Sequence, residues 1–269
     1  MPLDGGPSRK LADLAYPVRA LALGAGTAAA VTRNNDQDTV IRLWDLETGE
    51  ARDLETGEAR NLDAGDQIEI WNLKLTPDGR LISSGSYGIR IWNLEDGSFE
   101  TLSERIGLID LSRDGRFLLV GLQGEEHEAV LYDLEQGSSR QLDSHGYADY
   151  VALDPAGRFF VTVGELGKQV RVGPVTGEPP HLLVGPEVFY WPAVSPDGRW
   201  ITARGSGNNI TLWPVPDLSK PPFHELPYDQ LLASLRDLTN LRVVEEPEAT
   251  TGWGWDLDPF PGWEEAPTW

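Results

Sequence analysis

The residue types that carry chemistry in proteins are sparse in this sequence and form no recognised constellation. The four histidines lack the HxH and HExxH spacings of metal sites, and no GxSxG nucleophile elbow occurs. The densest group of candidate ligands lies in GLQGEEHEA, where three glutamates flank one histidine. A cation could bind there, but a solvated acidic loop is the favoured interpretation. The residues concerned are Glu125, Glu126, His127 and Glu128, and the other histidines are His145, His181 and His224.

The chain is strongly acidic, with 43 aspartates and glutamates against 22 lysines and arginines in 269 residues, a net charge of −21. Such a surface repels phosphate backbones and anionic lipid, so we expect neither a nucleic acid nor a membrane as partner. Solubility alone explains the acidity, and attraction of a basic partner is the alternative. The chain has no cysteine, which excludes disulfides and thiolate chemistry and favours a cytoplasmic location. The start, MPLDGGPSRK, lacks the apolar core of a signal peptide.

The elements that must position any site are short strands joined by a recurring turn. The turn sequences combine Pro, Asp and Gly, which preset φ, cap the backbone and accept positive φ, so each predicts a hairpin. They are TPDGR at Thr76–Arg80, SRDGR at Ser112–Arg116, DPAGR at Asp154–Arg158 and SPDGR at Ser195–Arg199.

A second signature recurs five times along the chain, a β-rich run that mostly ends near an aromatic residue, as in IRLWDLETG and IRIWNLEDG. Successive equivalent positions are 48, 40, 41 and 40 residues apart. A period near 40 with four short strands per unit predicts an all-β propeller, here with about five recognisable units. The equivalent positions are Trp44, Trp92, Tyr132, Gly173 and Trp213.

The first interval is eight residues longer than the others because the sequence contains a tandem duplication. Leu46–Asp53 reads LETGEARD and Leu54–Asn61 reads LETGEARN. Eight is an even number, so the insertion preserves the in–out alternation of a strand, and added length at a surface connection costs little free energy. We therefore interpret the second copy as structurally tolerated.

The turn signature and the W-[DN] ending resemble WD40-repeat β-propellers of the bacterial type, over roughly residues 8–226. The resemblance extends to the WD40 arrays at the C-terminal ends of large bacterial signalling proteins, which follow kinase or nucleotide-binding switch domains. Two departures stand out: the usual Gly-His pair survives only reversed, as His145-Gly146, and Asp38 before Thr39 is the best match to the family's aspartate. The resemblance thus implies an incomplete Trp–Ser/Thr–His–Asp network and greater reliance on apolar packing.

Alignment of the inner strands on the turn separates four columns of residues. Two columns are apolar and predict the core between units: Leu23, Leu75, Leu111, Leu153 and Val194, and Leu21, Leu73, Ile109 and Val151, broken by Pro192. A chemically mixed column, at the rim where WD40 domains usually bind partners, contains Arg19, Trp71, Gly107, Asp149 and Tyr190. The column that could line the channel reads Ala22, Lys74, Asp110, Ala152 and Ala193.

The C-terminal part departs from the period and predicts a separate tail. YDQLLASLRDLTN has a leucine stripe typical of a helix, and Val243–Val244 and Trp253–Trp255 flank a polar turn, which predicts a hairpin. Four of the ten tryptophans lie in the last 17 residues. The tail either covers an edge of the propeller or docks a partner through its aromatic residues. The expected domains are residues 1–16 with a candidate outer strand, a propeller at 17–226 and the tail at 227–269.

The functional prediction is a non-catalytic scaffold or sensor module of a bacterial signalling protein that binds a protein or peptide. Its candidate binding residues are Arg19, Trp71, Asp149 and Tyr190, with no cofactor. The alternative is a lactonase-like, metal-dependent hydrolase, but one acid and one lysine in the channel column do not make a metal site.

Ring closure is the open question of the architecture. Five three-stranded cores and six outer-strand candidates are counted, including SRKLADL at Ser8–Leu14 and PPFHELP at Pro221–Pro227. We expect an incomplete or unusually small propeller, part of a longer protein, in preference to a closed five-bladed monomer. Open strand edges would then allow self-association.

Overall fold

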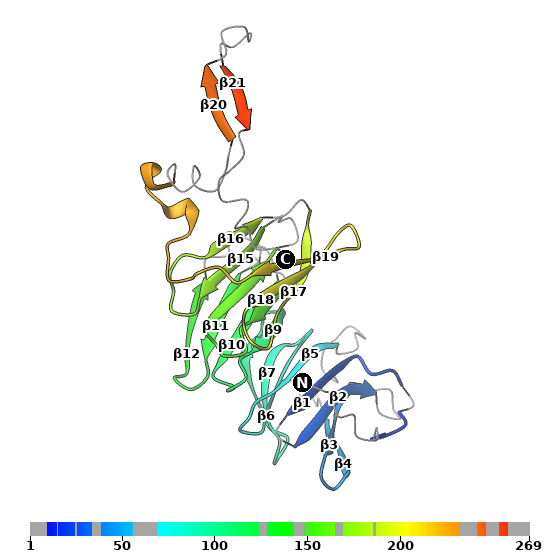
Figure 1. The fold of residues 1–269 in the computed structure, drawn as a ribbon. Coiled ribbons are helices and arrows are strands. Elements are labelled where there is room, and N and C mark those ends of the chain that lie inside the picture. The colour runs from blue at the N-terminus through cyan, green and yellow to red at the C-terminus, as the bar shows by residue number, and fades with distance from the viewer. Residues whose placement is uncertain are drawn as a thin grey trace. The chain divides into compact units, whose positions relative to one another are not determined.

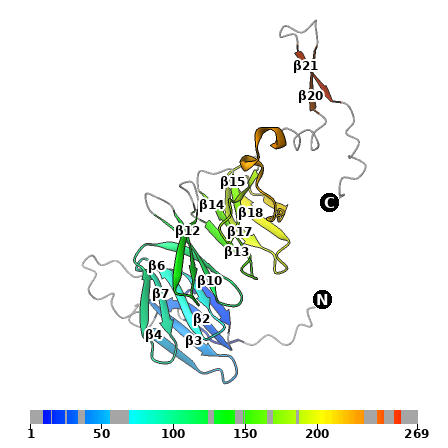
Figure 2. The same cartoon turned by 90° about the vertical axis from the view of Figure 1, so that its left-hand side faces the viewer.

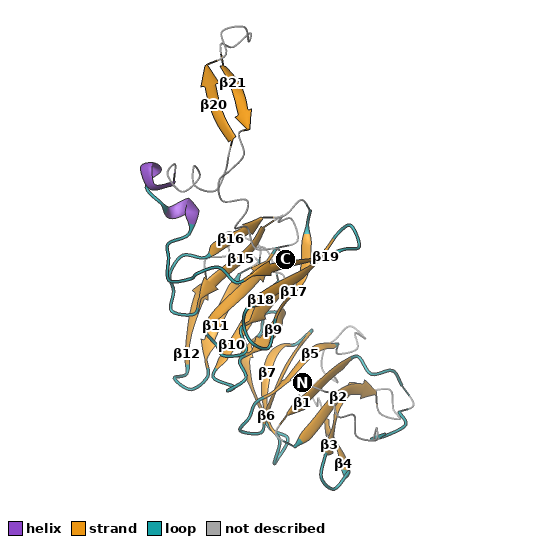
Figure 3. Cartoon of the chain, viewed as in Figure 1, coloured by secondary structure: helices purple, strands orange, loops and turns teal. Residues whose placement is uncertain are grey.

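The structure is a computed structural model, and its strands are arranged as five sheets and one separate hairpin. It describes residues 10–14, 16–24, 26–33, 39–55, 69–123, 128–142, 148, 150–164, 169–184, 187–231, 241–245 and 253–257. Strands dominate the described residues, and helix is confined to a short segment near residues 223–231 (Figure 3). No helix among these residues has the length and apolar composition needed to cross a membrane.

Four sheets, here called A to D, are antiparallel meanders of four consecutive strands (Figure 1). A has β1 (Ala20–Gly24), β2 (Thr27–Arg33), β3 (Thr39–Asp45) and β4 (Ala51–Glu55), and B has β5 (Ile70–Leu75), β6 (Arg80–Gly85), β7 (Gly88–Asn93) and β8 (Phe99–Ser103). C has β9 (Gly107–Leu111), β10 (Phe117–Leu122), β11 (Ala129–Asp133) and β12 (Ser138–Leu142), and D has β13 (Tyr150–Leu153), β14 (Phe159–Val163), β15 (Gln169–Pro174) and β16 (His181–Val184).

The fifth sheet, E, has three strands: β17 (Phe189–Val194), β18 (Trp200–Gly205) and β19 (Ile210–Pro214). The inner strands contact one another in the order β1, β5, β9, β13, β17, so each sheet packs on the next. In Figure 2 the sheets follow one another in chain order, from the blue strands of A to the yellow strands of E. This is the predicted propeller-type array of about five units, and the prediction of an all-β fold is confirmed.

The four predicted hairpin turns are confirmed, and each is closed by the first side chain of its motif. Thr76 Oγ1 accepts a hydrogen bond from the Arg80 amide at 2.9 Å, and Ser112 Oγ accepts one from the Phe117 amide at 2.9 Å. The glycine of each motif has a positive φ, for example 84° at Gly79, which is strained for other residues. The turns therefore form from local sequence alone.

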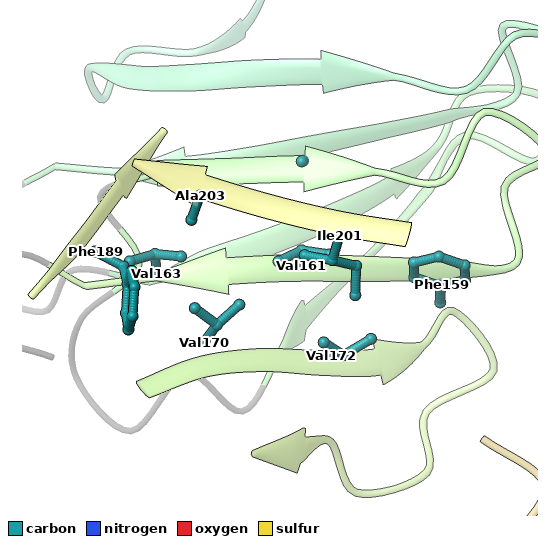
Figure 4. Packing of buried hydrophobic residues seen from close by; sticks show 9 residues of the cluster. Phe159, Val161, Val163, Val170, Val172, Phe189, Ile201 and Ala203 are labelled. Atoms are coloured by element: carbon teal, nitrogen blue, oxygen red, sulfur yellow. The ribbon is translucent and has the colours of Figure 1, made fainter. Parts of the chain in front are cut away.

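Apolar residues on facing sheet surfaces fill the spaces between neighbouring sheets. Each sheet has a forward face toward the next sheet in the chain and a rear face toward the preceding one. Figure 4 shows the interface of D and E, where Val170 and Val172 of the D forward face lie near Phe189 and Ile201 of E. The equivalent forward-face residues of sheets A to D are at most 5% exposed: Ile41, Ile89, Ala129 and Val170, and Leu43, Ile91, Leu131 and Val172.

Two terminal faces depart from this pattern and correct the prediction of a uniform core. Leu21 and Leu23 on the rear face of A are 72% and 74% exposed, although their equivalents in sheets B to D pack between sheets. Ile210 and Leu212 on the forward face of E are 79% and 58% exposed. The columns are correctly aligned, but a core position is buried only where a neighbouring sheet covers it.

Outer strands were predicted near both ends of the chain, and both predictions are wrong for the residues that the structure describes. The segment predicted as the last outer strand contains the 3₁₀ helix η2 (Phe223–Glu225), which prolines flank. Lys10–Leu14 is not a strand either, while residues 8 and 9 of that candidate lie outside the described residues. Among the described residues, sheet E therefore lacks the outer strand that sheets A to D possess.

Sheet B contains a buried polar network that the sequence prediction missed. Trp92 Nε1 donates a hydrogen bond to Ser83 Oγ at 2.8 Å, and Ser83 Oγ lies 2.6 Å from the Tyr87 hydroxyl. Burial raises the pKa of Tyr87 to about 12, although its hydrogen bond with Ser83 and the charge of Arg90 oppose this. The Arg90 guanidinium lies between the rings of Tyr87 and Phe99, 4.2 Å and 4.0 Å from their centroids. A tyrosine thus completes a Trp–Ser network in this sheet.

The chain divides into two compact units, residues 1–218 and 219–269, and the second contains the predicted tail hairpin. Strand β20 (Leu241–Glu245) pairs antiparallel with β21 (Trp253–Leu257), with Val243 opposite Trp255, so the hairpin prediction is confirmed. A helical turn begins at Tyr228, where the Leu231 amide donates to the Pro227 carbonyl at 2.9 Å. The rest of the predicted helix lies outside the described residues.

Candidate functional site

The candidate site is a rim formed where neighbouring inner strands begin. We define the rim as Arg19, Glu69, Trp71, Tyr150, Tyr190 and Trp191. Each inner strand starts here and ends at a hairpin turn, and side-chain contacts join the starts of neighbouring strands. The rim therefore consists of two groups, one joining A to B and the other joining D to E.

Glu69 organises the first group by bonding two predicted site residues at once. Its Oε1 accepts a hydrogen bond from Arg19 Nη1 at 2.8 Å, and its Oε2 accepts a longer one from Trp71 Nε1 at 3.4 Å. The Glu69 amide in turn donates to Ser86 Oγ at 3.1 Å. Trp71 remains 38% exposed, so its ring is oriented by Glu69 and still open to solvent.

Tyr150 organises the second group by contacting two aromatic residues of β17. Its ring meets Tyr190 edge-on at a centroid distance of 5.8 Å and lies 4.8 Å from Trp191. Aromatic rings at such distances attract through their quadrupoles as well as through buried area. Trp191 is nevertheless 56% exposed and presents a large apolar surface.

Trp191 has a strained backbone. Its φ is 51°, a left-handed conformation that bulky residues rarely adopt, and it precedes Pro192 at an irregularity in the β17–β18 pairing. Such conformations cost about 1–3 kcal/mol and persist only where the surrounding structure imposes them. The bulge turns the Trp191 ring toward Tyr150 and solvent.

The structure brings together three of the four predicted site residues as members of these two groups. Arg19 and Trp71 meet through Glu69, and Tyr190 lies in the aromatic group, while Asp149 lies outside the described residues. Sequence reasoning missed Glu69, Tyr150 and Trp191. The break of the apolar column at Pro192 was the signal that could have identified the bulge beside Trp191.

Lys74 and Asp110 of the predicted channel column bind each other. Lys74 Nζ lies 2.6 Å from Asp110 Oδ1, and Asp110 Oδ2 accepts a hydrogen bond from the Leu153 amide at 2.8 Å. Asp110 thereby connects the inner strands of B, C and D. A cavity of about 390 Å³ lies beside them and extends to Tyr150 and Trp191. The single acid of this column already has its oxygens engaged, which gives it a structural role.

No described histidine is among the residues that line this cavity. His181 lies on β16 and His224 in η2, and His127 and His145 lie outside the described residues. Within the described ranges, no group of three or more His, Asp or Glu side chains could hold a metal ion. The acidic GLQGEEHEA loop also falls largely outside those ranges, so its candidate cation site stays a sequence hypothesis.

Comparison with known proteins identifies the class of fold. No family model matches the chain. It is 25% identical over 250 residues to "Protein LST8 homolog" of Drosophila melanogaster, covering 85% of this chain and 76% of that protein. It is 29% identical over 155 residues to "WD repeat-containing protein SL1-17" of Schistosoma mansoni, covering 55% of this chain and 46% of that protein. The alignment thus spans about half of the second relative.

Together, the meander sheets and these two similarities define the first unit as a WD40-type β-propeller array. In particular, the chain is similar to an LST8 homolog and to a WD-repeat protein.

Proposed function

We propose that this protein is a non-catalytic scaffold that binds a protein or peptide partner at the rim. The observation that carries the proposal is the pair of exposed tryptophans, Trp71 and Trp191, which neighbouring side chains hold in fixed orientations. Aromatic residues of this kind dominate the binding energy of interfaces, and side chains that are already ordered lose less entropy on binding. The similarity to WD-repeat proteins supports the same function.

A basic partner fits the electrostatics of the chain. The net charge of −21 attracts cationic segments and increases their rate of association at low salt. At the rim, the Glu69 carboxylate is half-exposed beside Trp71, although Arg19 partly neutralises it. The proposed partner therefore presents basic residues around an apolar or aromatic contact.

The cellular context forms the second part of the proposal. We infer a signalling module in a bacterial cytoplasm. The absence of cysteine supports a reducing compartment, and the repeat signature supports the bacterial assignment. Both named relatives come from animals, so the bacterial assignment depends on the sequence signature alone.

Substitution of rim aromatics tests the binding proposal. The wild-type chain is used to capture partners from the native host, and the affinity of each captured partner is then measured for Trp71→Ala, Trp191→Ala and Tyr190→Ala. Each substitution should weaken binding by about 1 kcal/mol or more while unfolding stability changes less. Phe223→Ala is the matched control, since Phe223 is 50% exposed and lies outside both the rim and the tail. Equal binding by all four variants would disprove the rim as the binding surface.

A further inference from the structure

The two end faces of the array are complementary parts of the same repeated interface. Within the array, every forward face packs against the rear face of the following sheet. The forward face of E and the rear face of A carry the corresponding residue types, but no sheet of the described residues packs against them. They are Ile210 and Leu212 on E, and Leu21 and Leu23 on A.

The exposure of these four residues contrasts with that of their equivalents. Ile210 is 79% exposed, whereas Ile41, Ile89, Ala129 and Val170 at the same repeat position are all 0% exposed. Leu23 is 74% exposed, whereas its equivalent Leu153 is 3% exposed. Large apolar side chains that are exposed side by side on a sheet face favour an interaction site.

We propose that the forward face of sheet E binds the rear face of sheet A of a second copy of this chain. The occupant follows from the repeat itself, because the surface that covers a forward face elsewhere in this array is always a rear face. Among the described residues, the array has one face of each kind without a neighbouring sheet, and Leu21, Leu23, Ile210 and Leu212 on these faces are exposed. This inference does not rest on the proposed function at the rim: the residues that carry it are not rim residues, although Tyr190 of the rim pairs with Arg204 on the forward face.

Part of the rear face is already covered, which locates the contact near the inner strand. Leu14 and Leu46 pack on Ala28, Ala30 and Trp44, at the outer part of this face. The leucines of β1 lie beyond that cover. The second copy therefore contacts β1 first, as sheet A does with β5 in the A–B interface.

Charge does not prevent this contact, despite the acidity of the chain. On β1 to β3 the rear face carries Arg42 beside Ala30, and on β17 to β19 the forward face carries Arg204 beside Ile210. The residues of these six strands that share the two faces include no carboxylate, whereas in the outer strand β4 Asp53 pairs with Arg42 and Glu55 with Val40. Repulsion between two copies of net charge −21 opposes the contact, and added salt screens it.

The interface joins two different surfaces and is therefore heterologous. Two copies can form this contact twice and make a closed dimer. Alternatively, each copy can bind a further copy, which gives an open chain of copies. An association driven by apolar faces and opposed by net charge should strengthen as salt is added. An association through complementary charges would weaken under the same conditions.

Two charge substitutions in complementary faces test the proposal by light scattering after size exclusion. Leu23→Glu disables the rear face and leaves the forward face intact, while Leu212→Glu does the reverse. Each variant alone should be monomeric with an unchanged melting temperature, because both side chains are exposed in the single copy. The wild-type chain should associate as its concentration rises, more so at higher salt.

The mixture of the two variants is the decisive measurement. An equimolar mixture retains one intact forward face and one intact rear face, so it should give a dimer and nothing larger. Phe223→Glu, at a 50% exposed position in the second unit, is the matched control and should associate like the wild type. Three outcomes would each overturn the proposal: a wild type that stays monomeric at all concentrations, either variant associating by itself, or a mixture that remains monomeric.

Discussion

The Tyr87→Phe variant should be less stable than the wild type at neutral pH and more stable than the wild type at strongly alkaline pH. Burial raises the pKa of Tyr87 from about 10.0 to about 12. Between these values the unfolded chain releases the phenolic proton and the folded chain retains it, so rising pH favours unfolding. Two pKa units correspond to about 2.7 kcal/mol of stability, all of which is lost once the pH passes 12.

At neutral pH the same hydroxyl stabilises the fold, because it forms a hydrogen bond with Ser83. Tyr87→Phe should therefore lower the free energy of unfolding by about 1 kcal/mol at pH 7. Near pH 12 the variant should be the more stable protein by about 1–2 kcal/mol, because it has no proton to lose at this position.

Urea unfolding followed by tryptophan fluorescence, repeated from pH 7 to 12, measures this crossing. Other groups titrate in the same range, but they do so in both proteins and cancel in the difference. Tyr228→Phe, at an exposed position in the second unit, is the control and should follow the wild type throughout. If the free energies of wild type and Tyr87→Phe run parallel to pH 12, the assigned burial of Tyr87 is wrong.

Two further changes test the array itself. Deletion of Leu54–Asn61 places Leu62 where Leu54 now stands in β4. The free energy of unfolding should therefore fall by less than about 1 kcal/mol and the melting temperature should change little. A fall in the melting temperature of more than about ten degrees would contradict this. Asp110→Ala removes the acceptor shared by Lys74 and the Leu153 amide. The free energy of unfolding in urea should therefore fall by about 1–3 kcal/mol. An unchanged midpoint of urea unfolding would show that Asp110 does not join the sheets.

The repeated elements were predictable from the sequence because their causes are local. The turn of Thr76–Arg80 requires a glycine with positive φ and a capping hydroxyl, and both requirements are visible in five letters. The period near 40 similarly follows from four strands and their turns. The hairpin at Val243 and Trp255 followed from two β-rich runs around a polar turn.

The end faces and the rim could not be fully predicted because they depend on neighbours. Nothing in the residues around Leu23 distinguishes it from buried Leu153, since the difference is the presence of a sheet on the other side. Glu69 precedes its strand without any motif, and only the fold brings it to Arg19. The prolines of Pro221–Pro227 do indicate locally that this segment is not a strand. The strand was predicted there because the repeat pattern requires an outer strand in each unit.

The meander order of each sheet has a consequence for how this protein folds. Every sheet consists of strands that are consecutive in the chain, and the inner strands contact those of adjacent sheets in sequence order. Such an array behaves nearly as a one-dimensional system, in which nucleation in any unit is followed by propagation to its neighbours. Loss of a terminal unit breaks one interface, whereas loss of a middle unit breaks two. Cooperativity is therefore greatest around sheet C, and unfolding begins at the two ends.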